Sequence, residues 1–401
     1  MRILTFTTLY PNLLQPQHGI FVETRLQKLV ASGAVSARVV APCPWFPLAS
    51  ERFGRYAVFA RVPREETRRG LQVDHPRYPV LPRIGMSAAP LALFAAVLPF
   101  LRRQIRDGQE FDLIDAHYFY PDGVGAVLLG RTLGRPVVVT ARGSDLNIIA
   151  RHAVPRRWIR WAAQHADGLV AVSGGLKRRL VELGIAASRV CVLRNGVDLT
   201  LFRPPDRDRA RAVLGFTRPT LLAVGNLVAL KRHGLMVEAL THLPEFELVI
   251  AGEGPERVGI ERLARQRGVA DRVRLLGRVP QDRLPEIYSA ADLLLLASTH
   301  EGWPNVLLES MACGTPVLVS PTNGVADIVA APEAGRILSD VEPSALAAAV
   351  RDFLAAPPSR AATRRYAERF DWQSTTDGQI GLMREVLERR SKLRPIAAPA
   401  A

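Results

Sequence analysis

Two glutamates, Glu301 and Glu309, enclose seven residues that include Gly302 and Pro304. Proline is well tolerated at the first turn of a helix, so we expect a helix that begins at Pro304 and carries Glu309 about one turn inside. A carboxylate there can accept hydrogen bonds from ribose hydroxyls, and Glu301 on the preceding loop can contact sugar hydroxyls. Gly302 would let the backbone approach a ligand closely. The segment therefore predicts a pocket for a polyhydroxylated ligand.

The start of the same helix is a predicted anion site. The first N–H groups of a helix have no acceptor within it, and the positive end of the helix dipole lies behind them. Here these groups belong to Asn305, Val306 and Leu307. A diphosphate suits such a position, and a diphosphate beside ribose and sugar hydroxyls describes a nucleotide sugar. Taken alone, the two glutamates would also fit ordinary acids at a helix start.

The elements that must position these residues are short β-branched runs that alternate with amphipathic helices. Several runs are continuously apolar, which indicates strands buried on both faces of a parallel sheet. Strands are expected at 2–7, 37–41, 112–116, 137–140, 168–172 and 190–193, and again at 220–224, 246–251, 272–276, 292–297 and 316–320. Helices are expected between them, for example at 20–32 and 175–183. The predicted fold class is α/β, with two doubly wound, Rossmann-like domains.

A chain of 401 residues is too long for one ordinary core, so two domains are expected. We predict an N-terminal domain over 1–198 and a C-terminal domain over 199–372, with a terminal helix, 373–392, that returns to the first. Ligands of such folds bind at the carboxyl ends of the strands, so the chemistry is expected in a central cleft that both domains face.

Two further segments are assigned by composition. The run Asp206-Arg207-Asp208 matches the letters of a metal-binding acid pair, but it lies in the linker with an arginine between the acids. It is interpreted as a solvated charge cluster, and no metal site is expected. Residues 392–401 are expected to be unstructured.

The glutamate segment continues in a pattern that resembles a known family. From Ser298 to Val317 it runs Ser-x-x-Glu-Gly-x-Pro-Asn-Val-x-x-Glu-x-Met-Ala-x-Gly-x-Pro-Val. This is similar to the E-x7-E motif of the retaining glycosyltransferases of family 4, whose fold is called GT-B, and to their bacterial polysaccharide or teichuronic-acid group. The segment that begins Asn195-Gly196-Val197-Asp198 resembles the N-G-[VI]-D hinge of that family. The resemblance is strongest over 195–320 and loosest over 43–110, the part that should recognise the acceptor.

The resemblance implies a set of donor-binding residues in the second half. Val224 through Lys231 looks like the family's glycine loop with its phosphate-binding lysine. Asn226 stands where an arginine is commoner, and Arg232 is a candidate substitute for that cation. The donor-binding residues are expected to be Gly19, Gly225, Asn226, Lys231, Arg232, Gly254, Arg278, Val279, Glu301, Gly302, Asn305, Val306, Leu307 and Glu309.

The first half carries the remaining positions. Gly19 at a helix start resembles the flexible loop over the donor phosphates, although a simple glycine turn stays open. His117 matches the family's active-site histidine and is expected near the transferred sugar, with Glu301 and Lys231 as the other catalytic residues. Arg142, where the family commonly has histidine, could contact an acceptor or donor phosphate or form an ion pair with Asp145.

The resemblance implies transfer of a sugar from a nucleotide sugar, with retention of anomeric configuration and without a metal. The acceptor would be a glycan or a lipid-linked glycan in cell-surface polysaccharide biosynthesis. The nucleotide sugar is a co-substrate, and no cofactor is expected. A departing diphosphate would be stabilised by helix N–H groups and by cations such as Lys231.

Four other functions are alternatives to sugar transfer. A dehydrogenase would need G-x-G-x-x-G after the first strand, where the chain has Thr7 to Asn12 without a glycine. A nucleotide-sugar epimerase and a sugar-phosphate phosphorylase of the same architecture remain open. A non-enzymatic sugar-binding module is the alternative of a different class.

The formal net charge of +15 implies a negatively charged partner. No DNA- or RNA-binding pattern accompanies it, so phosphate-bearing substrates and an anionic membrane surface are expected, and nucleic acid is not. Residues 151–161 mix cations with two tryptophans, which is typical of an interfacial helix, although the tryptophans could equally pack inward.

The apolar stretch 84–101 could be a packed helix, a membrane-docking surface or a membrane span. Three scattered cysteines fit a reducing compartment. We expect a cytoplasmic protein, peripheral on the inner face of the membrane.

Overall fold

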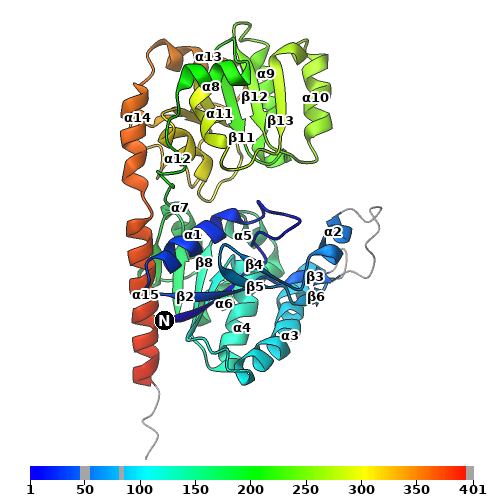
Figure 1. The fold of residues 1–401 in the computed structure, drawn as a ribbon, viewed down its shortest axis with the longest axis vertical. Coiled ribbons are helices and arrows are strands. Elements are labelled where there is room, and N and C mark those ends of the chain that lie inside the picture. The colour runs from blue at the N-terminus through cyan, green and yellow to red at the C-terminus, as the bar shows by residue number, and fades with distance from the viewer. Residues whose placement is uncertain (46–54, 81–84, 394–401) are drawn as a thin grey trace, which may run out of the picture. The chain divides into compact units, whose positions relative to one another are not determined.

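A computed structural model describes residues 1–45, 55–80 and 85–393, and the chain divides into two compact units (Figure 1). The first unit comprises Met1–Arg194 together with the segment that starts at Gln373, and the second comprises Asn195–Trp372. Residues 195–198, which were expected in the first domain, belong to the second unit. The N–H of Val197 donates to the carbonyl of Phe370 over 2.8 Å, and the backbone of Gly196 lies against that of Asp371.

The first unit is built on a mostly parallel sheet in the order β10-β9-β8-β7-β1-β2-β5-β4, in which β4 alone is paired antiparallel among the described strands. Its strands are β1 (Arg2–Phe6), β2 (Ser36–Val40), β4 (Glu65–Arg68), β5 (Leu71–Asp74), β7 (Leu113–His117), β8 (Val137–Ala141), β9 (Gly168–Ala171) and β10 (Val190–Val192). All six strands predicted for this half are confirmed, each within one residue at its start.

Four of the strands that the structure describes in this unit were not predicted. They are β4, β5 and the separate parallel pair β3 (Cys43–Trp45) and β6 (Arg77–Pro79). β4 reads Glu-Glu-Thr-Arg and lies at the sheet edge with no buried residue. Without an apolar run, its sequence carries no strand signal.

Helices pack in two groups around the first sheet. One group contains α3, α4 and α6, and the other contains α1 and α15, which also contacts β9. The helices are α1 (Ile20–Ala31), α2 (Arg55–Arg61), α3 (Gly85–Arg106), α4 (Val124–Leu133), α5 (Ser144–Asn147), α6 (Ala153–His165), α7 (Gly174–Glu182) and α15 (Gln373–Leu393). The core between α1, α15 and the sheet includes Leu26, Val39, Val138 and Met383. Lys392 and Leu393, within the tail expected to be unstructured, end α15; residues 394–401 lie outside the described part.

The second unit is built on a parallel sheet in the order β13-β12-β11-β14-β15-β16. Its strands are β11 (Thr220–Val224), β12 (Glu247–Ala251), β13 (Val273–Gly277), β14 (Leu293–Leu296), β15 (Val317–Val319) and β16 (Gly335–Ile337). The five predicted strands are confirmed and β16, a three-residue edge strand, was missed. The predicted α/β class with two doubly wound units is confirmed.

The helices of the second unit also form two groups. α9, α10 and α13 pack together, as do α8, α11, α12 and α14. Their bounds are α8 (Arg207–Leu214), α9 (His233–Leu240), α10 (Arg257–Gln266), α11 (Leu284–Ala290), α12 (Asn305–Ala312), α13 (Pro343–Ala355) and α14 (Arg360–Ala367).

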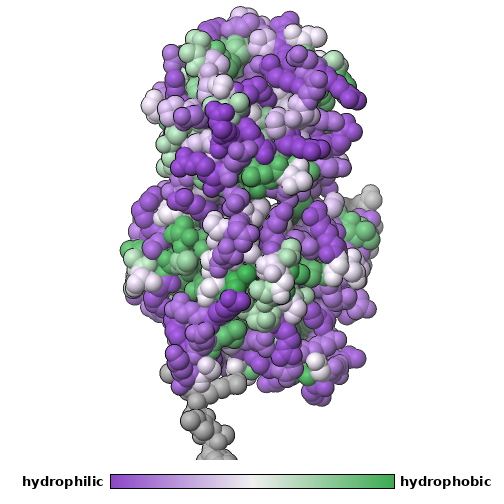
Figure 2. Space-filling model, turned by 60° about the vertical axis from the view of Figure 1, so that its left-hand side comes forward, coloured by the Kyte–Doolittle hydropathy of each residue, from purple (hydrophilic) through white to green (hydrophobic). Residues whose placement is uncertain are grey.

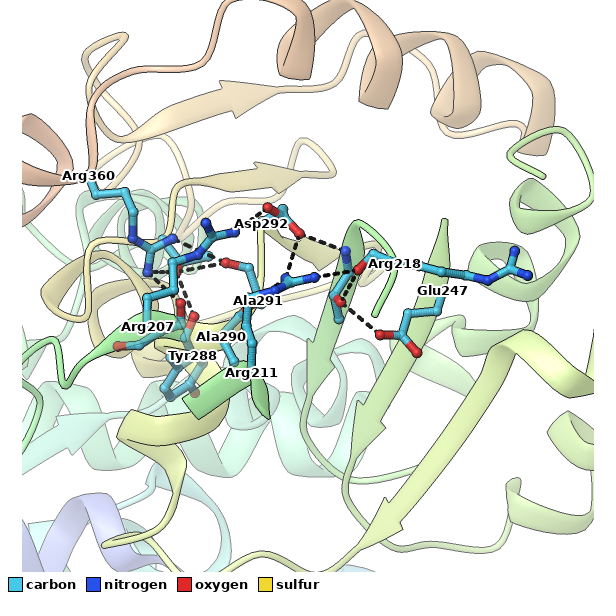
Figure 3. A network of polar contacts seen from close by, with 12 residues as sticks. Arg207, Arg211, Arg218, Glu247, Tyr288, Ala290, Ala291, Asp292 and Arg360 are labelled. Carbon is cyan, nitrogen blue, oxygen red and sulfur yellow. Dashed lines mark hydrogen bonds and ion pairs between the residues drawn. The ribbon is translucent and has the colours of Figure 1, made fainter. Parts of the chain in front are cut away.

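Asp292, just before β14, anchors the amino end of this sheet (Figure 3). Its carboxylate accepts from the N–H of Thr220 at 2.7 Å and from the guanidinium groups of Arg207 and Arg211. Arg360 joins the same network by donating to the carbonyl groups of residues 289, 291 and 313. The interpretation of 206–208 as a solvated charge cluster is therefore wrong for Arg207, while Asp206 caps α8 by accepting from the N–H of Arg209.

The strand order fixes where ligands can bind each unit. In both sheets the first strand has later strands on either side: β1 lies between β2 and β7, and β11 between β12 and β14. The loops at the carboxyl ends of β1 and β7, and likewise of β11 and β14, lead in opposite directions along the sheet and leave a crevice where ligands bind. In the second unit these loops begin at Gly225 and Ala297, and in the first at Thr7 and Tyr118.

Helix α3 is the element behind the apolar stretch 84–101, of which Ile84 lies outside the described residues. Leu93, Val97 and Leu101 are buried, whereas Met86 and Leu91 are about half exposed. Among the described residues one helix, Met86–Arg106, is apolar and long enough to cross a membrane, with a mean hydropathy of 1.3. Core helices of globular proteins pass the same test. Figure 2 shows one face of the molecule, on which hydrophilic residues predominate and apolar residues form separate patches.

Candidate functional site

Two glycine-containing turns meet at the carboxyl ends of β11 and β12. Gly225 has a φ of 147°, and its N–H donates to the carbonyl of Ala251 over 3.0 Å. A Cβ on Gly252 would lie 1.9 Å from the carbonyl oxygen of Gly225, and one on Gly254 would lie 2.3 Å from that of Leu227. The two backbones therefore touch where only glycine fits. Gly254, which was expected to bind the donor, lets the two turns pack together in this structure.

Replacing Gly252 with alanine is expected to separate these two turns. The new Cβ would overlap backbone that has no rotamer to yield, so we expect a loss of about 1–3 kcal/mol in the free energy of unfolding. Gly259→Ala on α10 is the matched control, because nothing lies within 4 Å of its Cβ position. That change should leave stability unchanged or raise it by up to about 1 kcal/mol. Equal urea midpoints for the two variants would contradict the close approach.

Lys231 and Glu301 form an ion pair with 2.6 Å between Nζ and Oε1. Lys231 ends the 3₁₀ turn Ala229–Lys231, and Glu301 lies on the loop after β14. The N–H of Thr299 donates to the carbonyl of Leu230 over 2.9 Å and ties the two segments together. Glu301 was expected to contact sugar hydroxyls; in this structure its Oε1 holds the lysine, and the sugar contact stays a prediction.

Arg232 and Asn226 complete this loop. Arg232 adopts a left-handed backbone with φ 49°, and its Nε donates to the carbonyl of Ala297 over 2.6 Å. The side chain thus supports the β14 loop through its Nε. Asn226 is exposed on the turn, and its carbonyl accepts from the N–H of Val228.

Helix α12 begins one residue later than expected. Pro304 is its N-cap, with extended φ and ψ, and Asn305 is the first helical residue. The N–H of Leu307 donates to the carbonyl of Pro304 over 3.1 Å, so of the three expected anion-binding groups this one is already used. The Asn305 side chain accepts from Asn195 at 3.2 Å. Val306 lies in the first turn, while Gly302 is buried with its carbonyl against the backbone of Gly324.

Glu309 accepts a hydrogen bond from the hydroxyl of Tyr288 at 2.8 Å. Burial raises the pKa of Glu309 to about 7, and the hydroxyl partly opposes that rise. Tyr288 was not singled out from the sequence, because a lone tyrosine in a helical run predicts core packing. It is 21 residues from Glu309 in the sequence, so no local pattern indicates that the two side chains meet.

Arg278 and Val279 follow β13, the outer neighbour of β12. Gly277 has φ 69°, which turns the chain at the strand end. The Arg278 guanidinium pairs with Glu253 at 3.3 Å, and about half of each side chain is exposed. The expected nucleobase-reading stretch therefore lies beside the Gly252–Gly254 turn.

In the first unit, Gly19 is the N-cap of α1 with φ 68°. A Cβ there would lie 2.2 Å from the carbonyl oxygen of Leu9, so the turn requires glycine. The loop after β1 is further held by Asp122, whose carboxylate accepts from the N–H of Thr8 at 2.7 Å and from the hydroxyls of Thr7 and Thr8. Burial raises the pKa of Asp122 to about 7. Asp122 was not among the residues predicted from the sequence.

His117 is buried between two charged groups. Its Nε2 lies 3.2 Å from Asp115 and its Nδ1 lies 2.6 Å from Nη2 of Arg142. Since a guanidinium can only donate, Nδ1 accepts and Nε2 carries the proton. Burial lowers the pKa of His117 to about 4, which keeps the imidazole neutral. Both ring nitrogens of His117 thus face protein partners.

Arg142 and Asp145 were expected either to pair or to face a phosphate. The Arg142 guanidinium is turned to His117 and lies 5.4 Å from the ring centre of Phe21. Asp145 accepts backbone N–H groups, from Gly143 at 2.7 Å and from Phe119 at 2.9 Å. Asp145 shapes this loop through the backbone.

A residue of α15 reaches the same network. The Gln379 amide donates to Asp115 over 3.0 Å and accepts from Nε of Arg25 at 2.7 Å. Both partners are fully buried. Neither Arg25 nor Gln379 was predicted, because no local pattern links residues 354 positions apart.

Within residues 1–45, 55–80 and 85–393, no three or more His, Cys, Asp or Glu side chains gather where they could hold a metal ion. The candidate groups for chemistry in the second unit are Lys231, Glu301, Glu309 and the start of α12. These groups suit a ligand that carries phosphate charge and hydroxyls.

Two family models match the chain. The model described as Glycosyltransferase Family 4 matches residues 37–201, and that described as Glycosyl transferases group 1 matches residues 206–370. A D-inositol 3-phosphate glycosyltransferase of Rhodococcus opacus (strain B4) is 31% identical over 82% of this chain and 80% of its own length. TuaC of Bacillus subtilis (strain 168), with a proposed role as a teichuronic acid biosynthesis glycosyltransferase, is 30% identical over 82% of this chain and 83% of its own.

Solved structures share the fold over nearly the whole chain. The sucrose-phosphate synthase of Thermosynechococcus elongatus has a TM-score of 0.79 at 20% identity and covers 97% of this chain and 99% of its own. HepE of Anabaena, solved in complex with UDP-glucose, has a TM-score of 0.71 at 17% identity, with 96% and 99% covered.

Proposed function

The chain belongs to glycosyltransferase family 4 and has the GT-B fold, and we propose that it transfers a sugar from a nucleotide sugar to a glycan or lipid-linked acceptor. The glycosyltransferase activity follows from the family. The donor, the acceptor, the stereochemistry and the place in metabolism are the parts that we propose.

The Lys231–Glu301 pair carries the donor proposal. It lies where the loops after β11 and β14 diverge, with the glycine loop on one side and the start of α12 on the other. A nucleoside diphosphate would offer Lys231 two phosphates in place of one carboxylate. Glu301, once released, could then accept hydrogen bonds from the transferred sugar. Binding of the donor would therefore replace the contact between Lys231 and Glu301 by contacts of each side chain with the donor.

The remaining groups fit the same ligand. Glu309 would accept from the ribose hydroxyls, and the N–H groups of Asn305 and Val306 would face the diphosphate. Arg232 uses Nε for Ala297, and its Nη groups lie outside that bond, so they are candidates for the cation that Asn226 does not supply. The complex of HepE with UDP-glucose makes UDP-sugars the first donors to test.

The proposed reaction retains configuration. The bond between the anomeric carbon and the diphosphate oxygen breaks, and the acceptor oxygen bonds to the same face of that carbon. The acceptor proton passes to the departing diphosphate. Lys231 and the helix N–H groups would stabilise the negative charge that develops there, without a metal. Activity that persists in excess chelator would be the expected result.

The proposed acceptor belongs to cell-surface polysaccharide synthesis. The name of the Rhodococcus opacus relative includes inositol 3-phosphate, and that of TuaC includes teichuronic acid, so each names a phosphorylated or acidic compound. The net charge of +15 suits such acceptors and an anionic membrane surface, and we propose that the protein acts in the cytoplasm at the inner face of that membrane. Nucleic acid is not proposed as a partner.

A thermal-shift screen of UDP-, GDP- and ADP-sugars tests the donor, because a ligand of the folded state raises its melting temperature. Product analysis then separates the alternatives. Conversion of the donor without acceptor would identify an epimerase, dependence on phosphate would identify a phosphorylase, and binding without turnover on any acceptor would identify a binding module. The proposal requires a nucleotide product that appears only with an acceptor, together with a glycoside of retained configuration.

A further inference from the structure

A pocket of about 700 Å³ in the first unit is lined by an unusual number of arginines. It lies among α5, α6 and α7 and the 3₁₀ turn Ile149–Arg151. Its basic residues are Arg151, Arg156, Arg157, Arg160 and Arg179. Leu146, Ala150 and Leu183 supply apolar lining, and Glu182 is the one acid among the lining residues that the structure describes. Five positive charges against one negative charge leave a formal surplus of four around this pocket.

The protein compensates only part of this charge. Glu182 is already paired with Arg179, at 2.5 Å. In the part of the chain that the structure describes, the side chains of Arg156, Arg157 and Arg160 have no carboxylate or carbonyl partner, and all three are exposed. Arg156 and Arg160 are four residues apart on α6, where like charges repel and destabilise the helix. A concave surface with one sign of charge attracts and concentrates anions.

The chemistry of the pocket indicates the kind of anion. The planar guanidinium group matches phosphate oxygens with two parallel hydrogen bonds, so arginine clusters suit phosphate groups. The leucine and alanine lining suits a carbon skeleton that adjoins the phosphate. The volume lies within the 300–1,000 Å³ that is typical of small-molecule sites.

We propose that this pocket binds the phosphate or diphosphate group of an organic molecule, apart from the donor site on the second unit. Leu146 stands on α5, directly after the Arg142–Asp145 loop at the carboxyl end of β8, so the pocket adjoins the loops of the unit that should hold the acceptor. The bound group would be the phosphate of the acceptor, which rests on the proposed transferase function. That phosphate could belong to a soluble sugar phosphate or to the head of a membrane lipid.

The tryptophans of the same helix are arranged separately from this lining. Trp158 and Trp161 are half-buried and meet edge to face with 5.6 Å between ring centres. Neither lines the pocket. The arginines, and not the tryptophans, are therefore the groups to change.

The test uses the full chain with Arg156, Arg157 and Arg160 all changed to glutamine. The matched control changes Arg209, Arg262 and Arg265 to glutamine, which removes the same charge from exposed positions on α8 and α10. Binding of glucose 1-phosphate and of inorganic pyrophosphate is measured by calorimetry. We expect at least a tenfold loss of affinity in the pocket variant and less than a twofold change in the control. A second arm measures sedimentation with vesicles that contain phosphatidic acid, against vesicles of equal charge that carry fatty-acid carboxylates.

A selective loss with the soluble probes supports a soluble phosphate, and a selective loss with phosphatidic acid vesicles alone supports a lipid-borne one. Equal behaviour of the two variants in both arms would overturn the proposal. Circular dichroism melting of each variant checks that it folds. These binding measurements need no turnover, so they decide whether the pocket binds phosphate even if transfer is never detected. Normal donor binding in the pocket variant would leave the donor part of the proposed function intact. Normal turnover of the pocket variant at limiting acceptor would contradict the assignment of the pocket to the acceptor phosphate.

Discussion

Replacing Lys231 with alanine is expected to lower kcat about 100- to 1,000-fold, because the lysine would stabilise the negative charge of the departing diphosphate. Donor affinity should change much less, since a group that acts mainly on the developing charge affects the transition state more than the bound substrate. Steady-state kinetics with the donor found in the screen measures both quantities. A variant with unchanged kcat would show that Lys231 is only the partner of Glu301.

The structure allows a sharper version of this experiment. Lys231 and Glu301 lie 2.6 Å apart and are both partly buried, so removing one leaves the other without its counter-charge. Glu301→Gln and the double variant complete a cycle that separates their coupling from their contacts with the donor. If the donor replaces the contact between Lys231 and Glu301 as proposed, the double-variant cycle should show coupling in the unfolding free energy of the free protein. The coupling in the unfolding free energy of the donor complex should be much smaller. Equal coupling in both states would contradict the replacement.

Donor affinity is expected to rise about tenfold between pH 6 and pH 8, because Glu309 has a pKa of about 7 and, if it binds the ribose as proposed, only its ionised carboxylate would accept from both hydroxyls. Binding of the donor would favour the ionised form, so calorimetry at pH 6 should detect proton release as a dependence of the heat on the buffer. Glu309→Gln should remove this pH dependence and weaken binding about 10- to 100-fold at pH 8. Glu333→Gln, an exposed acid of the same unit, is the control.

Replacing Tyr288 with phenylalanine is expected to shift the pH dependence of donor affinity in a defined direction. The Tyr288 hydroxyl stabilises the carboxylate and opposes the rise of its pKa, so its removal should move the midpoint of the affinity profile to higher pH. A midpoint that stays in place, or moves to lower pH, would contradict the Tyr288–Glu309 contact.

The same carboxyl affects stability. A pKa raised from 4.5 to about 7 means that the folded protein binds more protons than the unfolded chain between these values. The contribution of Glu309 is therefore most favourable below pH 4.5 and is lost as the pH rises through 7, by up to about 3 kcal/mol. In Glu309→Gln this part of the pH dependence should be absent from urea unfolding curves.

The sequence by itself determined where most strands of the two sheets lie along the chain, whereas the order of the strands within each sheet came from the structure. A strand such as β11 or β8 is specified by its own apolar run, and the loop after it inherits its place from the strand order. Gly225 and Lys231 were assigned to the same site as Glu301 through the family resemblance, and the structure places the loops that carry them after the neighbouring strands β11 and β14. Short polar edge strands such as β4 escaped, because their pairing depends on a neighbour and not on their own pattern.

Only the tertiary structure decided which side chains meet. Lys231 and Glu301 are 70 residues apart, and Gln379 and Asp115 are 264 apart, so no local periodicity reports that they touch. The tautomer of His117, the direction of Arg142 and the raised pKa of Glu309 all depend on burial and on partners from other elements. The arginine pocket is of the same kind: the sequence shows a basic helix, but a concave site needs α5 and α7 beside it. Strands follow from local burial patterns, whereas charge pairing and pKa follow from distances that exist only after the chain has folded.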